Sequence, residues 1–556
     1  MNSAVAARPR AQLTLASIAV AFAAADTYVV VLALPDLMSG VGLSADELQR
    51  AAPIISGFLL GYIAVLPLIG RIADVAGRTP VLVGALMLFA VGSLITAVAY
   101  DLPLVVTGRF LQGVGGGGLV PATLALVADL WPPQRRGLPL GVVGAVQELG
   151  AVLGPLLGAA VLAVADWRYI FWLNLVVAIV LAVLLRGLRP PPLSALVGLL
   201  ACVALGLTLT APQRLANDVT LGLPFVPFTG TSRLLTPIGV AALVLGLLWA
   251  VLTVRRSQLT DLLRQVDVPG ALLLALALSG VVLAFATADP ERELMSPAGP
   301  WLLIGAAVFA VAFVAWQRRT PRAIIPTGLL TARPAWGSLV VSFLVGCALI
   351  AALVDVPVFA RTTQGGGQLA AALVLVRFLI ALPVGAVVGG WLTRRYGLGL
   401  ITGAGLALAG AMFVVMSFWG RNALDHFAAT AVLLLCGFGF GLALSPVNTA
   451  VLGATPPANH GLVSALVVVA RMVGMLVGVS ALTAIGLRRY FAIVDDVPSP
   501  NELCPTAPAS CRPFVDALRD AAISQTHAIF AGAAVCAFLA AILAIALLGR
   551  RGVVHT

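Results

Sequence analysis

The chain has 556 residues, of which 61% are hydrophobic and only 10% are charged. A soluble domain carries about 25% charged residues, so this composition excludes a chain that is soluble throughout and predicts a membrane protein. The formal net charge is +11, and all 33 basic residues are arginine. These arginines are scattered and not clustered, which argues against nucleic-acid binding and indicates roles in membrane topology and contact with anionic lipid.

Apolar stretches recur along the whole chain and predict an all-α polytopic membrane protein. A spanning helix needs roughly 17–25 residues. Sixteen stretches come close to that length or exceed it: 13–34, 53–70, 80–99, 103–130, 138–165, 169–186, 193–211, 237–254, 268–288, 301–316, 336–360, 368–391, 399–419, 428–450, 462–486 and 528–549. An even number of spans puts both chain ends on one side. Arginine is more frequent on that side than in the opposite short loops, so both termini are expected in the cytoplasm.

Two stretches between the apolar runs are too polar to span a membrane. Residues 212–236 are rich in Pro, Gly and Thr, and residues 488–527 form a longer extension that contains Cys504 and Cys511. The expected topology puts both stretches on the outer, oxidising face, where these two cysteines can form a disulfide. Two free thiols are the alternative.

A charged turn between the second and third spans has a pattern of its own. Asp74 stands between Gly70 and Gly77, and Arg78 follows. This turn resembles the signature loop of the major facilitator superfamily. The resemblance implies a conformational latch, in which the aspartate caps a helix of the other half and the arginines pair with acids such as Asp129. A solvated turn whose charges only set topology is the alternative.

The fifth span carries a glycine and proline pattern, namely Gly141, Gly150, Gly154, Pro155 and Gly158. It resembles the antiporter motif of the drug:proton antiporters in the same superfamily. Gly and Pro allow neighbouring helices to approach closely and permit a local bend.

The fourth and sixth spans add two further resemblances. Residues 109–113 (Arg-Phe-Leu-Gln-Gly) are similar to the superfamily's buried-arginine motif, and residues 167–174 (Trp-Arg-Tyr-Ile-Phe-Trp-Leu-Asn) resemble a segment of its fourteen-span branch. Residues 113–118 formally match a dinucleotide-binding pattern, but no βαβ unit surrounds them. We interpret these glycines as sites of close helix packing.

Several ionisable residues lie inside apolar spans, where each costs about 2.5–3.5 kcal/mol on insertion scales. Asp26, Glu148, Arg377 and Arg471 lie near the middle of their spans, and Asp355 lies nearer the outer end of its own. Two acids come from the first half and two arginines from the second. We therefore expect Asp26 and Glu148 to carry protons in a central cavity, with Arg471 as their charge partner. Permanent ion pairs that fix helix register are the alternative.

Segments around these charges resemble the mycobacterial triacylglycerol exporters of the fourteen-span branch, which work with a periplasmic lipoprotein. The matching segments are residues 25–31, 147–150, 379–386 and 460–474. The resemblance implies proton-coupling and transport roles for Asp26, Glu148 and Arg471. Two departures stand out: an arginine, Arg394 or Arg395, replaces the aspartate in the second copy of the signature loop, and Gly453 stands where the family has a further arginine.

The resemblance also implies a domain organisation. Residues 1–189 and 336–556 are expected to form two six-helix bundles, joined by residues 190–335. This central segment holds four spans where the branch has two. Residues 268–316 correspond to the usual pair, and residues 193–254 form an inserted hairpin.

The resemblance, together with the intramembrane charges, implies a proton-coupled secondary exporter of triacylglycerol-like lipids that acts by alternating access in the bacterial inner membrane. A proton-coupled multidrug efflux antiporter is the alternative. The expected partners are protons, a lipid or hydrophobic drug, and a periplasmic lipoprotein docked near the extension; a monomer without metal or other cofactor is expected. An enzyme is disfavoured, because the four histidines lie in loops or at the chain end and no HExxH, GxSxG or CxxC pattern occurs. A passive channel or receptor would not need both the antiporter motif and central acids.

Overall fold

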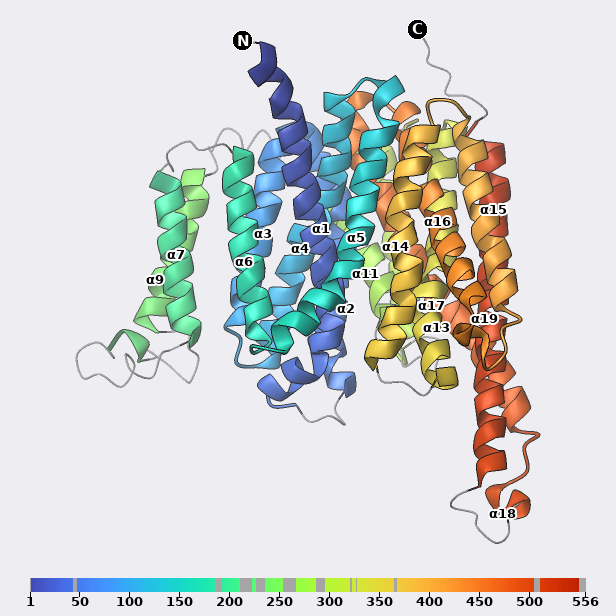
Figure 1. The fold of residues 1–556 in the computed structure, drawn as a ribbon. Helices are drawn as coiled ribbons and strands as arrows, with labels where there is room; N and C mark the ends of the chain where they lie inside the picture. Colours follow the sequence, from blue (N-terminus) through green and yellow to red (C-terminus); the bar gives the residue numbers. More distant parts are fainter. Residues whose placement is uncertain are drawn as a thin grey trace. The chain divides into compact units, whose positions relative to one another are not determined.

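The structure is a computed structural model, and every long element that it describes is a helix (Figure 1). It describes residues 2–43, 48–186, 193–210, 223–226, 236–253, 267–286, 296–320, 323–326, 328–364, 368–504 and 511–549. The long helices are α1 (Asn2–Gly40), α2 (Leu48–Ala76), α3 (Arg78–Ala97), α4 (Leu102–Leu130), α5 (Gly137–Leu162), α6 (Arg168–Arg186), α7 (Leu193–Thr210), α9 (Pro237–Thr253), α11 (Val268–Ala286), α12 (Gly299–Arg319), α13 (Arg333–Gln364), α14 (Gln368–Leu392), α15 (Leu398–Met416), α16 (Phe427–Gly453), α17 (His460–Val494) and α19 (Arg512–Leu547).

Each expected span falls on one of these helices, which confirms the all-α polytopic fold class. Within the described residues, twelve helices are long and apolar enough to cross a membrane. Three shorter apolar stretches, Ala11–Thr27, Leu196–Thr208 and Pro237–Gly246, lie in α1, α7 and α9. Proline occurs inside α2, α4, α13, α14 and α16, as spanning helices tolerate when neighbouring groups satisfy the backbone.

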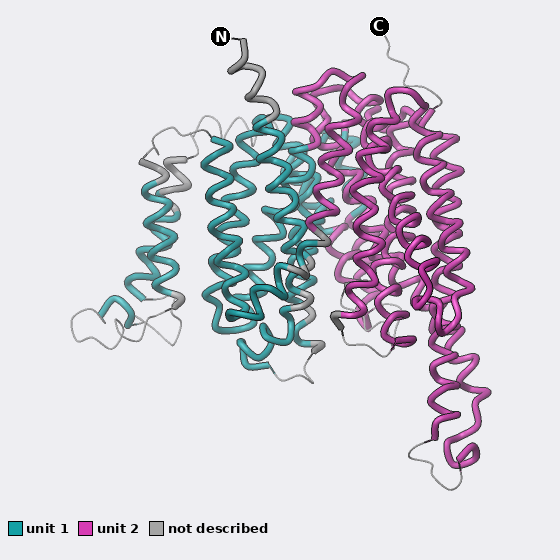
Figure 2. The backbone as a smooth tube through the Cα atoms, viewed as in Figure 1, with its two compact units in different colours: residues 1–123, 153–276, 310–325 teal, residues 124–152, 277–309, 326–556 magenta. Residues whose placement is uncertain are grey.

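The chain divides into two compact units (Figure 2). Unit 1 comprises residues 1–123, 153–276 and 310–325, and unit 2 comprises residues 124–152, 277–309 and 326–556. Four of the five unit boundaries therefore fall inside α4, α5, α11 and α12, and the fifth falls between α12 and α13. The division of the chain at 189 and 335 stays a prediction.

Unit 1 is built around α1, α2, α3 and α6, which pack against one another. Its main apolar cluster includes Val30, Leu37, Ile54 and Phe171, all of which are fully buried. The α7–α9 hairpin packs mainly on itself and reaches α3 through a small cluster that includes Leu94. Large apolar side chains elsewhere on the hairpin are exposed, as expected for helices surrounded by lipid.

Unit 2 is a bundle in which α13, α14, α15, α16, α17 and α19 pack against one another. A chain of aromatic rings, with centroids 5.5 to 6.4 Å apart, runs through it from α14 to α13. Its members in order are Phe378, Phe440, Phe413, Phe530, Trp419 and Phe359. Ring pairs of this kind contribute about 0.5–1.5 kcal/mol each beyond their buried area, so they hold these helices together.

The polar extension at residues 488–527 continues two helices of unit 2 beyond their expected spans. α17 runs on to Val494, α19 begins at Arg512, and the short helix α18 (Pro500–Leu503) lies at the tip of the projection (Figure 1). A disulfide joins Cys504 to Cys511. The extension is therefore a closed helical hairpin over its described residues.

A second contact holds the base of this hairpin. Arg421, in the loop between α15 and α16, donates hydrogen bonds of 2.7 and 2.5 Å to the carboxylate of Asp520, which lies outside the expected span 528–549. These bonds lower the pKa of Asp520 below its ordinary value. His527 donates through Nε2 to the carbonyl oxygen of Trp419 at 2.7 Å. The loop between α15 and α16 is thus hydrogen-bonded to α19 at two positions.

The first prediction concerns the disulfide. Cys504 and Cys511 should resist alkylation in the unreduced protein, and reduction should loosen the tip at a cost of about 2 kcal/mol, because a seven-residue separation closes only a short loop. Mass mapping with and without reductant measures this, with the free Cys202 and Cys536 as internal controls. Alkylation of both extension cysteines without reductant would contradict the pairing.

Candidate functional site

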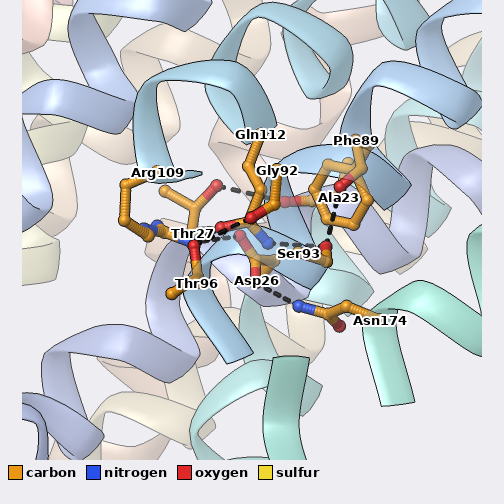
Figure 3. A network of polar contacts seen from close by, with 10 residues as sticks. All are labelled: Ala23, Asp26, Thr27, Phe89, Gly92, Ser93, Thr96, Arg109, Gln112 and Asn174. Atoms are coloured by element: carbon orange, nitrogen blue, oxygen red, sulfur yellow. Dashed lines mark hydrogen bonds and ion pairs between the residues drawn. The ribbon is translucent and has the colours of Figure 1, made fainter. Parts of the chain in front are cut away.

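The most buried charges of unit 1 form one cluster around Asp26 (Figure 3). Asp26 of α1 is 2% exposed and Arg109 of α4 is 1% exposed. Arg109 donates from Nη1 to Oδ2 of Asp26 at 2.5 Å, and Asn174 of α6 donates from Nδ2 to Oδ1. Each carboxylate oxygen therefore has its own donor, one charged and one neutral.

The cluster continues through a line of polar side chains toward α3. Arg109 also donates to Oε1 of Gln112 at 3.1 Å, because residues three apart share one face of a helix. Gln112 donates to Oγ of Ser93 at 2.8 Å, and Ser93 donates to the carbonyl oxygen of Phe89 at 2.8 Å. Arg109 therefore has two acceptors within reach, Asp26 and Gln112.

The environment of the Arg109 side chain is largely aromatic. Its guanidinium carbon lies 4.4 Å from the centroid of the Phe58 ring and 6.0 Å from that of Phe171. A desolvated cation over a ring gains about 2 kcal/mol. Among the described residues, Nε of Arg109 has no hydrogen-bond partner. The guanidinium is thus held in place without being saturated by hydrogen bonds.

The glycines of α4 explain how these side chains come so close. A Cβ atom at Gly113 would collide with the carbonyl oxygen of Phe58 on α2, and one at Gly108 would collide with Thr96 on α3. The backbone of α4 therefore packs directly on its neighbours. This agrees with the interpretation of the glycines as packing sites.

A second buried pair lies in unit 2. Arg471 of α17 and Glu148 of α5 have their nearest nitrogen and oxygen 3.8 Å apart, and their side chains are 11% and 12% exposed. That distance is an ion pair without a hydrogen bond. The pair that the sequence predicted between Glu148 and Arg471 is therefore present in the structure.

The antiporter-motif glycines bring α5 against its neighbours around this region. A Cβ atom at Gly141 would collide with the carbonyl oxygen of Ala386 on α14, and one at Gly154 would collide with that of Ala25, next to Asp26. Gly150, Pro155 and Gly158 lie on the same helix, and the side chain of Pro155 falls outside the described residues.

The pairing of Asp26 differs from the sequence expectation. Its cationic partner in the structure is Arg109 of its own unit, whereas Arg471 pairs with Glu148. The sequence placed Arg109 in a buried-arginine motif and Asn174 at the end of a branch-specific segment, and it made neither a partner of Asp26. A signal for Asn174 existed, since it is an amide inside an otherwise apolar helix.

The two remaining intramembrane charges are not part of either pair. Arg377 of α14 donates from Nη1 to Oγ1 of Thr430 on α16 at 3.0 Å. Asp355 of α13 is 7% exposed.

The signature loop forms a tight turn between α2 and α3. Gly77 has a φ of +94°, a conformation that strains any residue with a Cβ atom. Arg78 begins α3 and forms an ion pair with Asp74, whose side chain is fully buried. Gly70 lies one turn before Asp74 on α2. Asp74 and Arg78 thus contact each other within the loop, and the expected capping of a helix by Asp74 stays a prediction.

Asp129, at the end of α4, lies near Arg136. Arg136 donates to the carbonyl oxygens of Ala128 at 2.6 Å and Trp131 at 2.8 Å, which caps the end of α4. Burial lowers the pKa of Arg136, while the charge of Asp129 acts in the opposite direction. A role for Asp129 in a latch stays a prediction.

The second prediction concerns the signature loop. Asp74→Asn should lower transport about tenfold or more while the protein still folds, because a change of about 1.4 kcal/mol between conformations is enough. Transport at matched expression and the unfolding temperature measure both parts, with Asp36→Asn, an exposed acid of α1, as control. Wild-type rates in Asp74→Asn would remove the loop from the mechanism.

The sequence of the chain is similar to those of known membrane transporters. Residues 16–479 match the family model of the Major Facilitator Superfamily. The triacylglyceride transporter of Mycolicibacterium hassiacum is 37% identical over 489 residues, covering 86% of this chain and 79% of the relative. That of Mycolicibacterium smegmatis is 35% identical over 557 residues (97% and 87%), and that of Mycobacterium tuberculosis H37Rv is 36% identical over 500 residues (87% and 84%).

Solved structures of similar fold come from more distant proteins. The human organic anion transporter MFSD10 gives a TM-score of 0.56 at 16% identity, covering 96% of this chain and 99% of that one. The proton:xylose symporter XylE gives 0.56 at 14% identity, covering 98% and 97%. Together with the family match over most of the chain, these comparisons make the protein a member of the major facilitator superfamily.

Proposed function

We propose that the protein is a proton-coupled exporter of triacylglycerol-like lipids in the bacterial inner membrane. The observation that carries this proposal is the pair of buried carboxylate–arginine contacts, Asp26 with Arg109 and Glu148 with Arg471. Buried ionisable groups in spanning helices are costly and mark proton or substrate pathways. The names of relatives 35–37% identical to this chain support a triacylglyceride substrate.

Proton coupling would work through these carboxylates. Protonation neutralises Asp26 and weakens its attraction to Arg109, which stays charged at every accessible pH. Arg109 can then keep its contact with Gln112. Because the arginine never loses its charge, release of the proton toward the cytoplasm restores the original pair. Alternation between these two arrangements would drive the change between inward-facing and outward-facing conformations.

A second candidate function, multidrug efflux, is favoured by one observation. The antiporter-motif glycines Gly141 and Gly154 allow backbone-to-backbone packing of α5, and this motif serves drug:proton antiporters as well as lipid exporters. Purified protein that moves cationic dyes but never acylglycerols would select this candidate.

The remaining parts of the proposal concern topology and partners. Both termini lie in the cytoplasm, the extension at residues 488–527 lies outside and receives a lipoprotein, and the protein acts as a monomer. Reporter fusions at the C-terminus and within residues 505–510 should report opposite sides of the membrane. Equal reporter activity at the two positions would overturn this topology.

Transport in proteoliposomes tests the main proposal. Wild-type protein should move a fluorescent triacylglycerol faster when the side equivalent to the cell exterior is more acidic. Asp26→Asn should lose this acceleration, and Asp36→Asn, an exposed carboxylate on the same helix, should keep it. Transport that ignores the pH gradient in wild-type protein would refute proton coupling.

A further inference from the structure

A further buried carboxylate, that of Asp355, lies in unit 2 apart from both ion pairs. Asp355 of α13 is 7% exposed, which is as buried as the paired acid Glu148 at 9%. Asp26 has an arginine and an amide as donors, and Glu148 has an arginine. Asp355 makes no hydrogen bond or ion pair with any residue that the structure describes. Within the described part of the chain it is therefore a buried acid without a compensating charge.

The surroundings of Asp355 are apolar and aromatic. Ala352 and Phe359, one turn to either side on the same face of α13, are fully buried. The Phe359 ring lies 5.5 Å from that of Trp419, which lies 6.4 Å from that of Phe530. An ionised carboxylate in such a setting is strongly disfavoured, whereas a neutral carboxyl is tolerated far better.

The charged groups on neighbouring helices do not neutralise Asp355 in this conformation. Helices α14, α16, α17 and α19 pack against α13. Their ionisable side chains, with those of α13 itself, are Arg333, Cys347, Arg361, Arg377, Cys436, His460, Arg471, Arg488, Arg489, Tyr490, Arg512, Asp516, Arg519, Asp520, His527 and Cys536. Arg471 is engaged with Glu148, Arg377 with Thr430, and His527 with the carbonyl of Trp419.

Arg377 has a special position among these groups. α13 ends at Gln364 and α14 begins at Gln368, so Asp355 stands as many residues before the connection as Arg377 stands after it. At 1.5 Å per residue both lie about 14 Å from the ends of their helices. The two helices are in contact. Arg377 is thus a cation at the depth of Asp355, and its hydrogen-bond partner among the described residues is the neutral hydroxyl group of Thr430.

We propose that Asp355 is an additional proton-binding site, which holds a proton in this conformation and releases it when helix movement brings Arg377 to the carboxylate. The proton comes from water and returns to water, with the O–H bond of the carboxyl group formed and broken once per cycle. Release during transport rests on the proposed function. The presence of the proton on Asp355 in the resting protein does not depend on the proposed function. Binding of the proton and its release are therefore tested separately.

Infrared spectroscopy of the purified protein tests possession of the proton. The wild-type spectrum at neutral pH should contain the carbonyl band of a protonated carboxyl group that shifts in D₂O and is missing from Asp355→Asn. Asp355→Glu should retain such a band at a shifted frequency. Asp425→Asn, which removes an exposed acid of the same unit, should leave the band unchanged. Equal bands in wild-type protein and Asp355→Asn at neutral pH would show that Asp355 is ionised and would overturn the proposal.

Proteoliposome transport of the fluorescent triacylglycerol tests release. The slope of log transport rate against pH reports the number of coupled protons. Its magnitude should be smaller by about one in Asp355→Asn than in wild type and Asp425→Asn. An Arg377→Gln variant, which keeps the hydrogen-bond donor to Thr430 but removes the charge, should reduce the slope in the same way. An unchanged slope in both variants would make Asp355 a structural acid. If wild-type protein shows no dependence on pH at all, the proposed function fails, while the infrared result still decides whether Asp355 holds a proton.

Discussion

Arg109→Met is expected to destabilise the protein by about 3–5 kcal/mol, the largest effect on stability among the buried charges. The substitution removes the cation from a pair whose two side chains are at most 1% exposed. Asp26 is left as an uncompensated buried charge, and this is the costly way to break a buried pair. The contact of the guanidinium with the Phe58 ring is lost as well. Thermal unfolding in detergent should show a clear decrease in the unfolding temperature.

A double substitution separates the cost of the lone charge from loss of packing. Asp26→Asn with Arg109→Met removes both charges, and replacement of a whole buried pair is often close to neutral. The double variant should therefore recover much of the stability lost in Arg109→Met. Arg186→Met, which changes an exposed arginine at the end of α6, serves as the matched control. A double variant as unstable as Arg109→Met would mean that packing, not charge, decides the stability here.

The helices of this fold could be predicted from the sequence because each span must satisfy its backbone internally. Length was harder to predict than position. Hydropathy marks where a helix leaves the bilayer, but α17 continues to Val494 and α19 begins at Arg512, outside the expected spans 462–486 and 528–549. Where a helix continues from the bilayer into water, its side chains become polar while its backbone stays helical. The length of the apolar run is therefore shorter than the length of the helix.

The sequence predicted which charged residues are buried better than it predicted which of them pair with each other. Burial of Asp26, Glu148 and Arg471 followed from their position in apolar runs, since a charge at that depth needs a reason. The choice of partner depends on how each helix is rotated about its axis, which the sequence does not state. Asp26 therefore pairs with Arg109, a residue in another motif of the same unit. The contact of Asn174 with Asp26 was not predicted, because a single neutral amide costs little in a helix and its motif does not name a partner.

The geometry of the Asp26–Arg109 pair differs from that of the Glu148–Arg471 pair, which suggests that the two pairs have different roles. Asp26 is held by direct hydrogen bonds from two donors, whereas Glu148 and Arg471 are 3.8 Å apart and slightly more exposed. Breaking the Asp26–Arg109 pair should therefore lower the stability of the protein more than breaking the Glu148–Arg471 pair. The second is already loose, so its residues can change protonation or partner with little rearrangement. We therefore expect loss of the first pair to lower both stability and transport, and loss of the second to lower transport with little change in stability.

Glu148→Gln is accordingly expected to reduce proton-driven transport about 100-fold, equivalent to about 2.7 kcal/mol, with a far smaller decrease in unfolding temperature than Arg109→Met. Glutamine keeps the size of the side chain but cannot bind and release a proton, so the cycle loses its coupling step. Lipid uptake into proteoliposomes with and without a pH gradient measures this effect.

Exchange of the two charges provides the sharpest control for that result. Glu148→Arg with Arg471→Glu keeps an ion pair between α5 and α17 but moves the titratable group from one helix to the other. If the pair only fixes helix packing, the double variant should regain both stability and transport. We expect it to regain stability and to remain below about a tenth of the wild-type transport rate, more than 1.4 kcal/mol short, because the carboxylate no longer lies on the helix that carries the antiporter glycines. Recovery of proton-driven transport in the exchanged variant, or wild-type coupling in Glu148→Gln, would reduce this pair to a structural role.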